Sequence, residues 1–264
     1  MWLYVLSMYL LAGLGVNLGY HRVLSHRSLR VRKWLERALV LLGLPAGTPV
    51  QWIGNHRFHH AHADDPEDPH SPVQRGFWYA HTGWYMNSDS VELSVAYALL
   101  GPLRLLLDAW MRPRTNQQFY HLATDAAGHW WCRTLSRPLP YAAAMVAHFA
   151  VGAGLPVALW GGAGALLAWA TYTALYNLGD AVDSLTHMAG RRLPQQISSA
   201  RNNDLLGALL LGEGWHANHH WDPRCARHGW FRGQFDWTWQ VIRALRAAGL
   251  ADQVRYEFRA VEKG

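Results

Sequence analysis

Nine of the sixteen histidines lie in four short clusters, and they carry the most evident chemistry of this chain. Imidazole is the commonest side-chain ligand for transition metals, and a mononuclear site seldom uses more than three or four. Nine clustered imidazoles are therefore enough for two metal ions. The nine are His21, His26, His56, His59, His60, His187, His216, His219 and His220.

Two of the clusters repeat a spacing that places three histidines on one face of a helix. HRFHH over 56–60 and HANHH over 216–220 both have histidines at i, i+3 and i+4. With 16 histidines in 264 residues, this pattern is expected roughly 0.06 times by chance. His21 and His26 are five apart, on neighbouring helical faces, and Asp183 precedes His187 by four residues. We expect all four clusters to approach one shared centre.

The residue types by themselves leave the metal open, because imidazole suits iron, copper, zinc and nickel. Zinc cannot change oxidation state and would imply hydrolysis, for which a glutamate beside the ligands commonly activates water. Glu213, three residues before His216, keeps that alternative open. The two cysteines, Cys132 and Cys225, are too few for a thiolate site and are predicted to be free thiols.

The elements that must position the clusters are apolar and long. Half of the chain is hydrophobic and only 16% is charged, against roughly 25% in soluble domains. Residues 1–20 and 138–179 contain no Asp, Glu, Lys or Arg. Since about 20 apolar residues cross a bilayer, we predict an all-α integral membrane protein. Its spans are expected at about 2–20, 139–160 and 163–183, with the turn of the hairpin at Gly161-Gly162.

The segment 38–54 is predicted to be re-entrant or interfacial. As a helix its 17 uncharged residues would reach about 26 Å, against a hydrocarbon core of about 30 Å. Pro45, Gly47 and Pro49 also disfavour a continuous helix. If the segment crossed the membrane, the cluster at 56–60 would be stranded on the opposite side from the others.

The remaining parts form a histidine-rich helical cap in a single domain over 1–264. They are 21–37, 55–137 and 184–264. Positive residues stay on the cytoplasmic side, so the basic residues just after the first span place the cap there. The net charge of +6 is spread along the chain, which favours retention beside anionic lipid over nucleic-acid binding.

Within the cap, residues 99–110 are predicted to form a helix with a leucine stripe. Arg104 and Asp108 lie off that stripe, and the helix is expected to lie along the membrane or to pack on the core.

The clusters and their flanks resemble the membrane fatty acyl desaturases, in particular the delta-9 acyl-CoA and acyl-lipid group. The resemblance covers about residues 14–250 and is carried by GYHRVLSH, HRFHHAHADDPEDPHSPVQRGFWYAHTGW, DSLTHMAG, GEGWHANHH and CARHGWFRGQFDWTW. It implies an all-histidine site for two iron ions, with the nine clustered histidines as ligands. It also implies an enzyme that uses O2 and two external electrons to introduce a cis double bond into the long chain of an acyl-CoA or acyl-lipid.

The resemblance gives roles to further residues. Asp64, Asp68 and Glu213 are expected to orient ligand imidazoles. The family usually has Asn where this chain has Asp183, and that residue approaches one iron through water, so Asp183 is expected to bind through water or directly. Trp52 and Trp215, which stand beside clusters, are candidates for shaping a substrate channel.

Other expectations concern partners and alternatives. Electrons are expected from a separate ferredoxin or b-type cytochrome, since no residues remain for a fused haem domain. The family usually has a further transmembrane helix ahead of the first span seen here. Two alternatives stay open: a diiron acyl or alkyl hydroxylase, and a catalytically silent metal-binding membrane protein.

The other histidines receive weaker predictions. His62, His70 and His81 are expected to be loop residues or outer partners of ligands, whereas His121, His129 and His228 are predicted to lie on the surface or in the tail.

Overall fold

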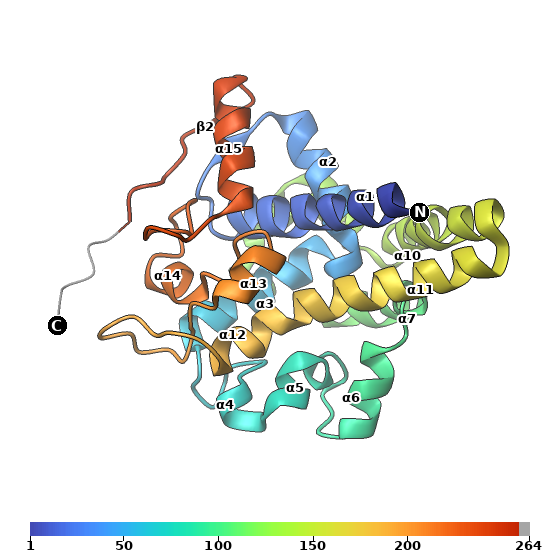
Figure 1. The fold of residues 1–264 in the computed structure, drawn as a ribbon, viewed down its shortest axis with the longest axis horizontal. Helices are drawn as coiled ribbons and strands as arrows, with labels where there is room; N and C mark the ends of the chain where they lie inside the picture. The colour runs from blue at the N-terminus through green and yellow to red at the C-terminus, as the bar shows by residue number, and fades with distance from the viewer. Residues whose placement is uncertain (259–264) are drawn as a thin grey trace.

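The computed structural model describes residues 1–258, which are mostly helical. Within this range two helical runs, Trp2–Ser25 and Pro138–Met188, are long and apolar enough to cross a membrane. Figure 1 shows these runs extending together toward the N-terminus, while the short helices that carry histidines gather at the opposite end of the molecule. The long helices therefore extend away from the histidine-bearing end and support it on one side.

The N-terminal helix continues beyond the segment predicted to span the membrane. Helix α1 (Trp2–Gly13) continues without a break into a π-helix, η1 (Leu14–Ser25). The helix that contains the predicted span at about 2–20 thus continues to Ser25, and His21 lies within it. The apolar side chains of α1 are all at least partly exposed, as a lipid-facing helix requires.

The second run is a hairpin. It comprises α10 (Pro138–Phe149), the π-turn η6 (Ala150–Gly154) and α11 (Leu155–Asp183), which leads into α12 (Leu185–Met188). The chain reverses at Gly161, whose φ of 56° and ψ of −134° are accessible mainly to glycine. This is the position at which the turn was predicted.

The segment 38–54 forms two helices instead of one continuous element. Helix α2 (Lys33–Gly43) ends in the 3₁₀ turn η2 (Leu44–Ala46), and α3 (Pro49–His62) begins after Thr48. The Thr48 side chain accepts a hydrogen bond from the Gln51 amide at 3.3 Å, which caps the new helix. The break directs α3 and its histidines toward the centre of the histidine-bearing end.

The region around 99–110 differs from the prediction. A first helix, α6 (Val91–Ala98), ends before it, and α7 (Leu103–Met111) begins only after Gly101 and Pro102, with a bend of 120° between the two. The leucine stripe faces outward, with Trp110 60% exposed, and does not pack on the core. Arg104 is instead only 2% exposed and pairs with Asp180 of α11 at 2.6 Å. With its apolar side outward and its charged side inward, α7 has the arrangement that suits a helix surrounded by lipid.

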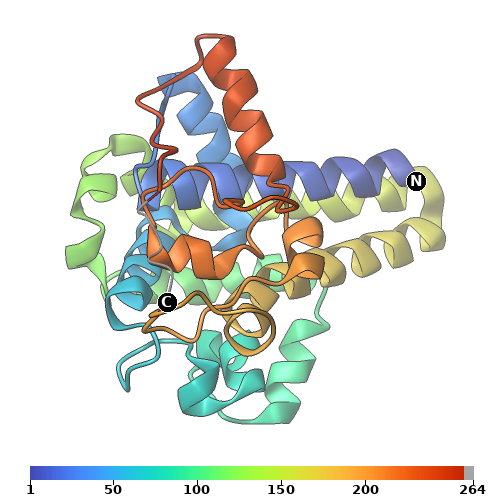
Figure 2. The ribbon, with the colours of Figure 1, turned by 60° about the vertical axis from the view of Figure 1, so that its left-hand side comes forward.

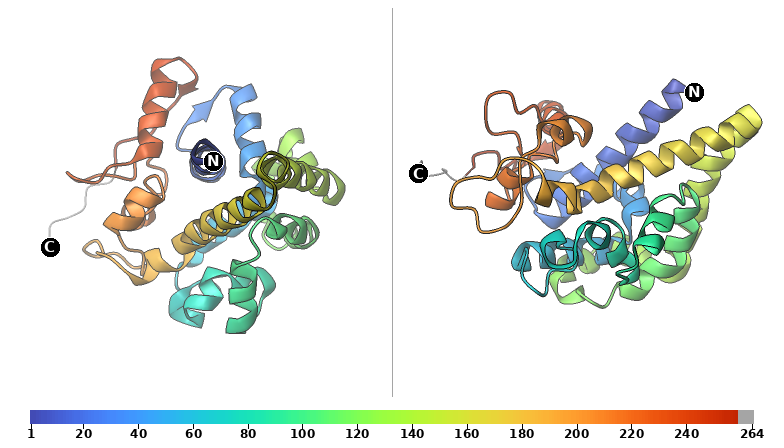
Figure 3. Two further views of the ribbon diagram at one scale, coloured as in Figure 1. Left: turned by 45° about the vertical axis from the view of Figure 1, so that its right-hand side comes forward. Right: turned by 60° about the horizontal axis from the view of Figure 1, so that its bottom comes forward.

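Short elements complete the histidine-bearing end. Strands β1 (Arg30–Val31) and β2 (Ala251–Asp252) pair antiparallel, with Arg30 opposite Asp252. Figures 2 and 3 show α15 (Trp237–Ala247, red) and α2 (blue) beside the long N-terminal helix, where α15 contacts η1. The remaining elements are α4 (Pro72–Arg75), α5 (Phe77–His81), η3 (Gly83–Met86), η4 (Arg112–Thr115), η5 (Tyr120–Leu122), α8 (Thr124–Gly128), α9 (Trp130–Leu135), α13 (Asp204–Leu209), α14 (His216–Trp221) and α15 (Trp237–Ala247).

Candidate metal centre

The structure brings the nine clustered histidines into two adjacent groups. In each group the ligand nitrogens all lie within 4.8 Å of one another. The first group contains His21, His26, His56, His60 and His219. The second contains His59, His187, His216 and His220.

The π-helical winding of η1 explains the unusual five-residue spacing of His21 and His26. A π-helix closes hydrogen bonds between residues five apart, and the His26 amide donates to the His21 carbonyl at 3.0 Å. Residues at this spacing therefore share a face, and the two rings lie 4.8 Å apart. An α-helix would have separated them, which is why the sequence predicted neighbouring faces.

The two H-x-x-H-H helices each contribute to both groups. On α3, His56 and His60 turn toward the first group and His59 toward the second. On α14 the division is reversed, with His219 in the first group and His216 and His220 in the second. The repeated spacing thus ties the two groups together at a fixed separation.

The spacing of the nitrogens fits metal coordination. Two nitrogens bound at about 2.1 Å and at right angles on one metal lie about 3.0 Å apart. In the first group the Nε2 atoms of His21 and His219 are 2.9 Å apart, and those of His60 and His219 are 2.8 Å apart. In the second group the Nε2 atoms of His187 and His216 are 3.1 Å apart. Two groups of convergent Nε2 atoms therefore match a site for two metal ions.

Carboxylates hold the outward Nδ1 atoms of some of these rings. Asp68 lies 2.9 Å from His59 Nδ1, and Glu213 lies 2.9 Å from His21 Nδ1. His187 Nδ1 is 3.0 Å from the Ser199 hydroxyl, which in turn donates to Asp64 at 2.9 Å. Such contacts fix the ring orientation and leave Nε2 free to bind a metal. All three predicted acidic residues are thus placed behind histidines of the two groups.

Burial keeps the rings in the form that binds metal. Desolvation lowers the pKa of His59 to about 4, even though Asp68 acts in the opposite direction. Burial likewise lowers the pKa of His56, His60 and His219 well below its ordinary value, and neighbouring histidines add to the effect. Neutral imidazoles present a free lone pair, so the site is ready for a cation at neutral pH.

Glu213 belongs to a buried ionic network. Its carboxylate contacts Arg22 at 3.2 Å, and Arg22 also contacts Asp236 at 3.2 Å. Burial alone would raise the pKa of Glu213, but Arg22 and the nearby histidines hold that pKa well below its ordinary value. A carboxylate engaged in this way is poorly placed to take a proton from water, which weighs against the zinc hydrolase alternative.

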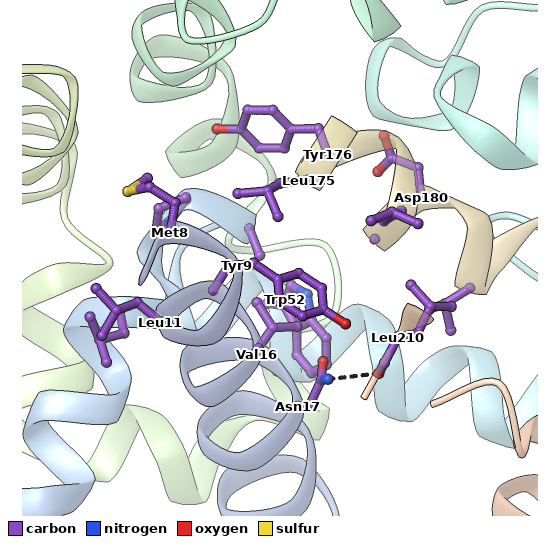
Figure 4. A pocket seen from close by; sticks show the side chains of 18 of the residues that line it. Met8, Tyr9, Leu11, Val16, Asn17, Trp52, Leu175, Tyr176, Asp180 and Leu210 are labelled. Carbon is purple, nitrogen blue, oxygen red and sulfur yellow. Dashed lines mark hydrogen bonds between the residues drawn. The ribbon is translucent and has the colours of Figure 1, made fainter. Parts of the chain in front are cut away.

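An apolar cavity of about 560 Å³ leads to the histidines. Figure 4 shows Met8 of α1 and Val16 of η1 on one side of this cavity, and Tyr176 and Asp180 of α11 on the other. Trp52, the predicted channel residue, lines this cavity, and Asp183 lines it close to the second group. Asp183 is in neither group of convergent ligand atoms, so it does not approach the second group as closely as the histidines approach one another.

The structure places Trp215 and His228 differently from what the sequence led us to expect. Trp215 is not among the described residues that line the cavity; its ring lies against Gly207 and its indole N–H donates to the Phe235 carbonyl at 2.9 Å. His228, predicted to lie on the surface or in the tail, is in the tail but buried: it is 1% exposed and lies 3.2 Å from Glu213. The tail folds back over the first group. The only sequence signal for this was the family-like segment around His228.

The other histidines fall into two kinds. His70 stacks on His59 at 4.3 Å, and His81 contacts Ser184 and Asn177 at 2.9 and 3.0 Å. Both are buried, and His70 contacts a histidine of the second group. His62 pairs with Asp65 near the surface, while His121 and His129 are exposed, as predicted. Cys132 and Cys225 are free and buried.

Comparison with known proteins identifies similar chains. The family model described as fatty acid desaturase matches residues 1–249. The chain is 34% identical over 253 residues to a palmitoyl-monogalactosyldiacylglycerol delta-7 desaturase of Arabidopsis thaliana, covering 94% of this chain and 60% of the relative. It is 31% identical to an sn-1 stearoyl-lipid 9-desaturase of Anabaena variabilis, covering 95% and 82%. It is 33% identical to an acyl-CoA C20 Delta5-desaturase of Anemone leveillei, covering 94% and 72%.

Proposed function

Because this chain belongs to the fatty acid desaturase family, we propose that it is an O2-dependent oxidoreductase that introduces a cis double bond into a long acyl chain. The chain spans about three fifths of the length of the first relatives it matches. The observation that carries the proposal is the pair of histidine groups at the inner end of an apolar cavity. Binding of an acyl chain there would place a saturated carbon pair beside two metal ions.

The nine histidines are proposed as the ligands of two iron ions. Iron bound there would supply the redox chemistry that O2-dependent removal of two hydrogens from a saturated chain requires. Asp68, Glu213 and Asp64 would orient ligand rings from behind. Asp183, which lines the cavity next to the second group, would act through water because it lies outside the set of convergent nitrogens.

The apolar cavity walls serve orientation and water exclusion. Trp52, whose ring stacks on His56 at 4.9 Å, lines the cavity beside the first group. A cavity of about 560 Å³ is in the range of sites that enclose a small-molecule ligand, roughly 300–1,000 Å³. We propose the delta-9 position for the double bond, supported by a relative named as a 9-desaturase.

We further propose that the histidine-bearing end lies on the cytoplasmic side of the membrane. Exposed basic side chains follow the first span there, namely Arg27, Arg30, Arg32 and Lys33, and such residues are retained inside. They also offer a docking surface for an acidic electron donor, a ferredoxin or a b-type cytochrome.

Mass spectrometry of lipids from cells that express the chain tests this function. We expect new cis-unsaturated acyl chains with the native sequence and none with His219→Ala, because His219 belongs to the first group. The control is His121→Ala, which removes an exposed histidine outside both groups and should leave the product unchanged. Hydroxylated chains without an alkene would indicate the hydroxylase, and bound iron without any product would indicate a silent metal-binding protein.

A further inference from the structure

The cavity between α1 and α11 reaches the outside through an uncharged rim. Six of its lining residues are themselves exposed, with Leu11 41% and Val151 66% exposed, and we take these six as the rim of the cavity. All six are apolar or glycine. They are Leu11, Leu41, Ala147, Val151, Gly179 and Leu209.

The charged residues that line the cavity do not lie at this rim. Among the described lining residues, the only arginine is Arg104, which is buried and engaged with Asp180 at 2.6 Å. The other non-histidine charges of the lining are the acidic Asp180, Asp183 and Glu213, none of which is exposed. Phosphate groups are recognised by Arg and Lys side chains, so this rim has nothing to hold the phosphates of a coenzyme A thioester.

The rim also lies on the helices that are candidates to cross the membrane. Leu11 belongs to the run Trp2–Ser25, and Ala147, Val151 and Gly179 belong to the run Pro138–Met188. An opening on these surfaces faces hydrocarbon when the helices span a bilayer. A lipid acyl chain is already in that medium, whereas the chain of a water-soluble thioester would have to cross the polar interface first.

We propose that the acyl substrate is presented by a membrane lipid and enters the cavity from the side, past α1. This inference rests on the proposed function, whose cavity it concerns, and it selects an acyl-lipid as the substrate over an acyl-CoA. The lipid headgroup stays in the interface near the histidine-bearing end, while the chain passes between the rim residues.

Photo-crosslinking tests the route without requiring turnover. The full chain is reconstituted in vesicles of diphytanoyl phosphatidylcholine with one of two probes, a phosphatidylcholine or a stearoyl-CoA, each with a diazirine on its acyl chain. We expect the phosphatidylcholine probe to label peptides that line the cavity, with a yield at least about fivefold above the thioester probe. Labelling by the thioester alone, or no labelling of these peptides by either probe, would overturn the proposal.

A matched pair of variants locates the opening. Gly179 lies on the rim, and an added Cβ would meet nothing within 4 Å, so Gly179→Phe can obstruct the rim without a backbone clash. Gly154 has equally open surroundings on the same helical run but does not line the cavity, so Gly154→Phe is the control. We expect labelling to fall by about fivefold or more in Gly179→Phe alone. An equal yield in both variants would place the entrance elsewhere.

The two proposals can fail separately. Cavity labelling by the lipid probe together with no unsaturated product in cells would reject the desaturase function and leave the lipid route standing. Unsaturated product together with labelling by the thioester probe alone would reject the lipid route and leave the desaturase function standing. If Gly179→Phe does not fold, the comparison of the two probes on the native sequence still decides the route.

Discussion

Replacing Asp68 with asparagine should weaken metal binding at the second histidine group and spare the first. The Asp68 side chain is fully buried and accepts a hydrogen bond from His59 Nδ1 at 2.9 Å. It also accepts from the backbone amides of Asp64 and His70, at 2.8 and 3.1 Å. Burial alone would raise the pKa of Asp68, but the hydrogen bond from His59 holds that pKa below its ordinary range, so the carboxylate is charged at neutral pH.

The size of the effect follows from these contacts. Asparagine keeps the volume and one acceptor oxygen but removes the negative charge behind His59, a ring of the second group. Outer carboxylates of this kind contribute about 10- to 100-fold in metal affinity, which corresponds to about 1.4–2.7 kcal/mol. The lost acceptor for a backbone amide removes about 1 kcal/mol more from folding stability.

The measurement is metal content per chain during titration with a chelator, in detergent. One of the two ions should leave Asp68→Asn at a chelator concentration about 10- to 100-fold lower than in the native protein. The control is Asp65→Asn, because Asp65 contacts His62 Nδ1 at the same 2.9 Å although His62 belongs to neither group. Equal retention in Asp68→Asn and the native protein, or equal loss in both variants, would refute the reasoning.

Three further outcomes follow from the same geometry. Glu213→Gln should weaken binding at the first group by about 10- to 100-fold, because Glu213 orients His21 at 2.9 Å, and the same chelator titration would contradict this if the second group lost its ion first. Asp183→Asn should leave the metal content and the chelator midpoints unchanged, since Asp183 is outside both groups; a lost ion would show that its carboxylate is a ligand. In the metal-free protein, burial lowers the pKa of His59 to about 4, so below the ordinary value of 6.5 the unfolded chain binds more protons than the folded one. Stability should therefore fall as pH decreases from about 6.5 toward 4, and an unfolding temperature that stays constant or rises over that window would contradict the depressed pKa.

The chemistry of the site could be predicted because ligand type and spacing are local properties. An H-x-x-H-H sequence on a helix presents three imidazoles to one side whatever the rest of the fold does. The helical periodicity and the apolar lengths also indicated the hairpin and its reversal at Gly161. The requirement that all clusters share one side of the membrane further constrained the topology.

Features that depend on long-range packing could not be predicted in this way. The π-helical winding that aligns His21 with His26 arises where the first span packs against α2 and α3, and no propensity of the residues themselves indicates it. His228 reaches the first group only because the chain after α14 folds back over Arg22 and Glu213. Trp215 stands next to His216 in sequence, but on a helix neighbouring residues point in different directions.

Helix α7 shows how the surrounding medium changes the meaning of a pattern. The alternation of leucines with Arg104 and Asp108 is the pattern of a helix at a water interface, with its apolar side inward. Here the charged side is inward, because Arg104 meets Asp180 of α11 and contacts the rings of Tyr85, Tyr97 and Tyr176 at 4.2–4.8 Å. Lipid accepts the leucines at no cost, while the buried charges need partners inside the protein. The same principle underlies the proposed lipid route: a rim of apolar side chains is compatible with an entrance that faces hydrocarbon.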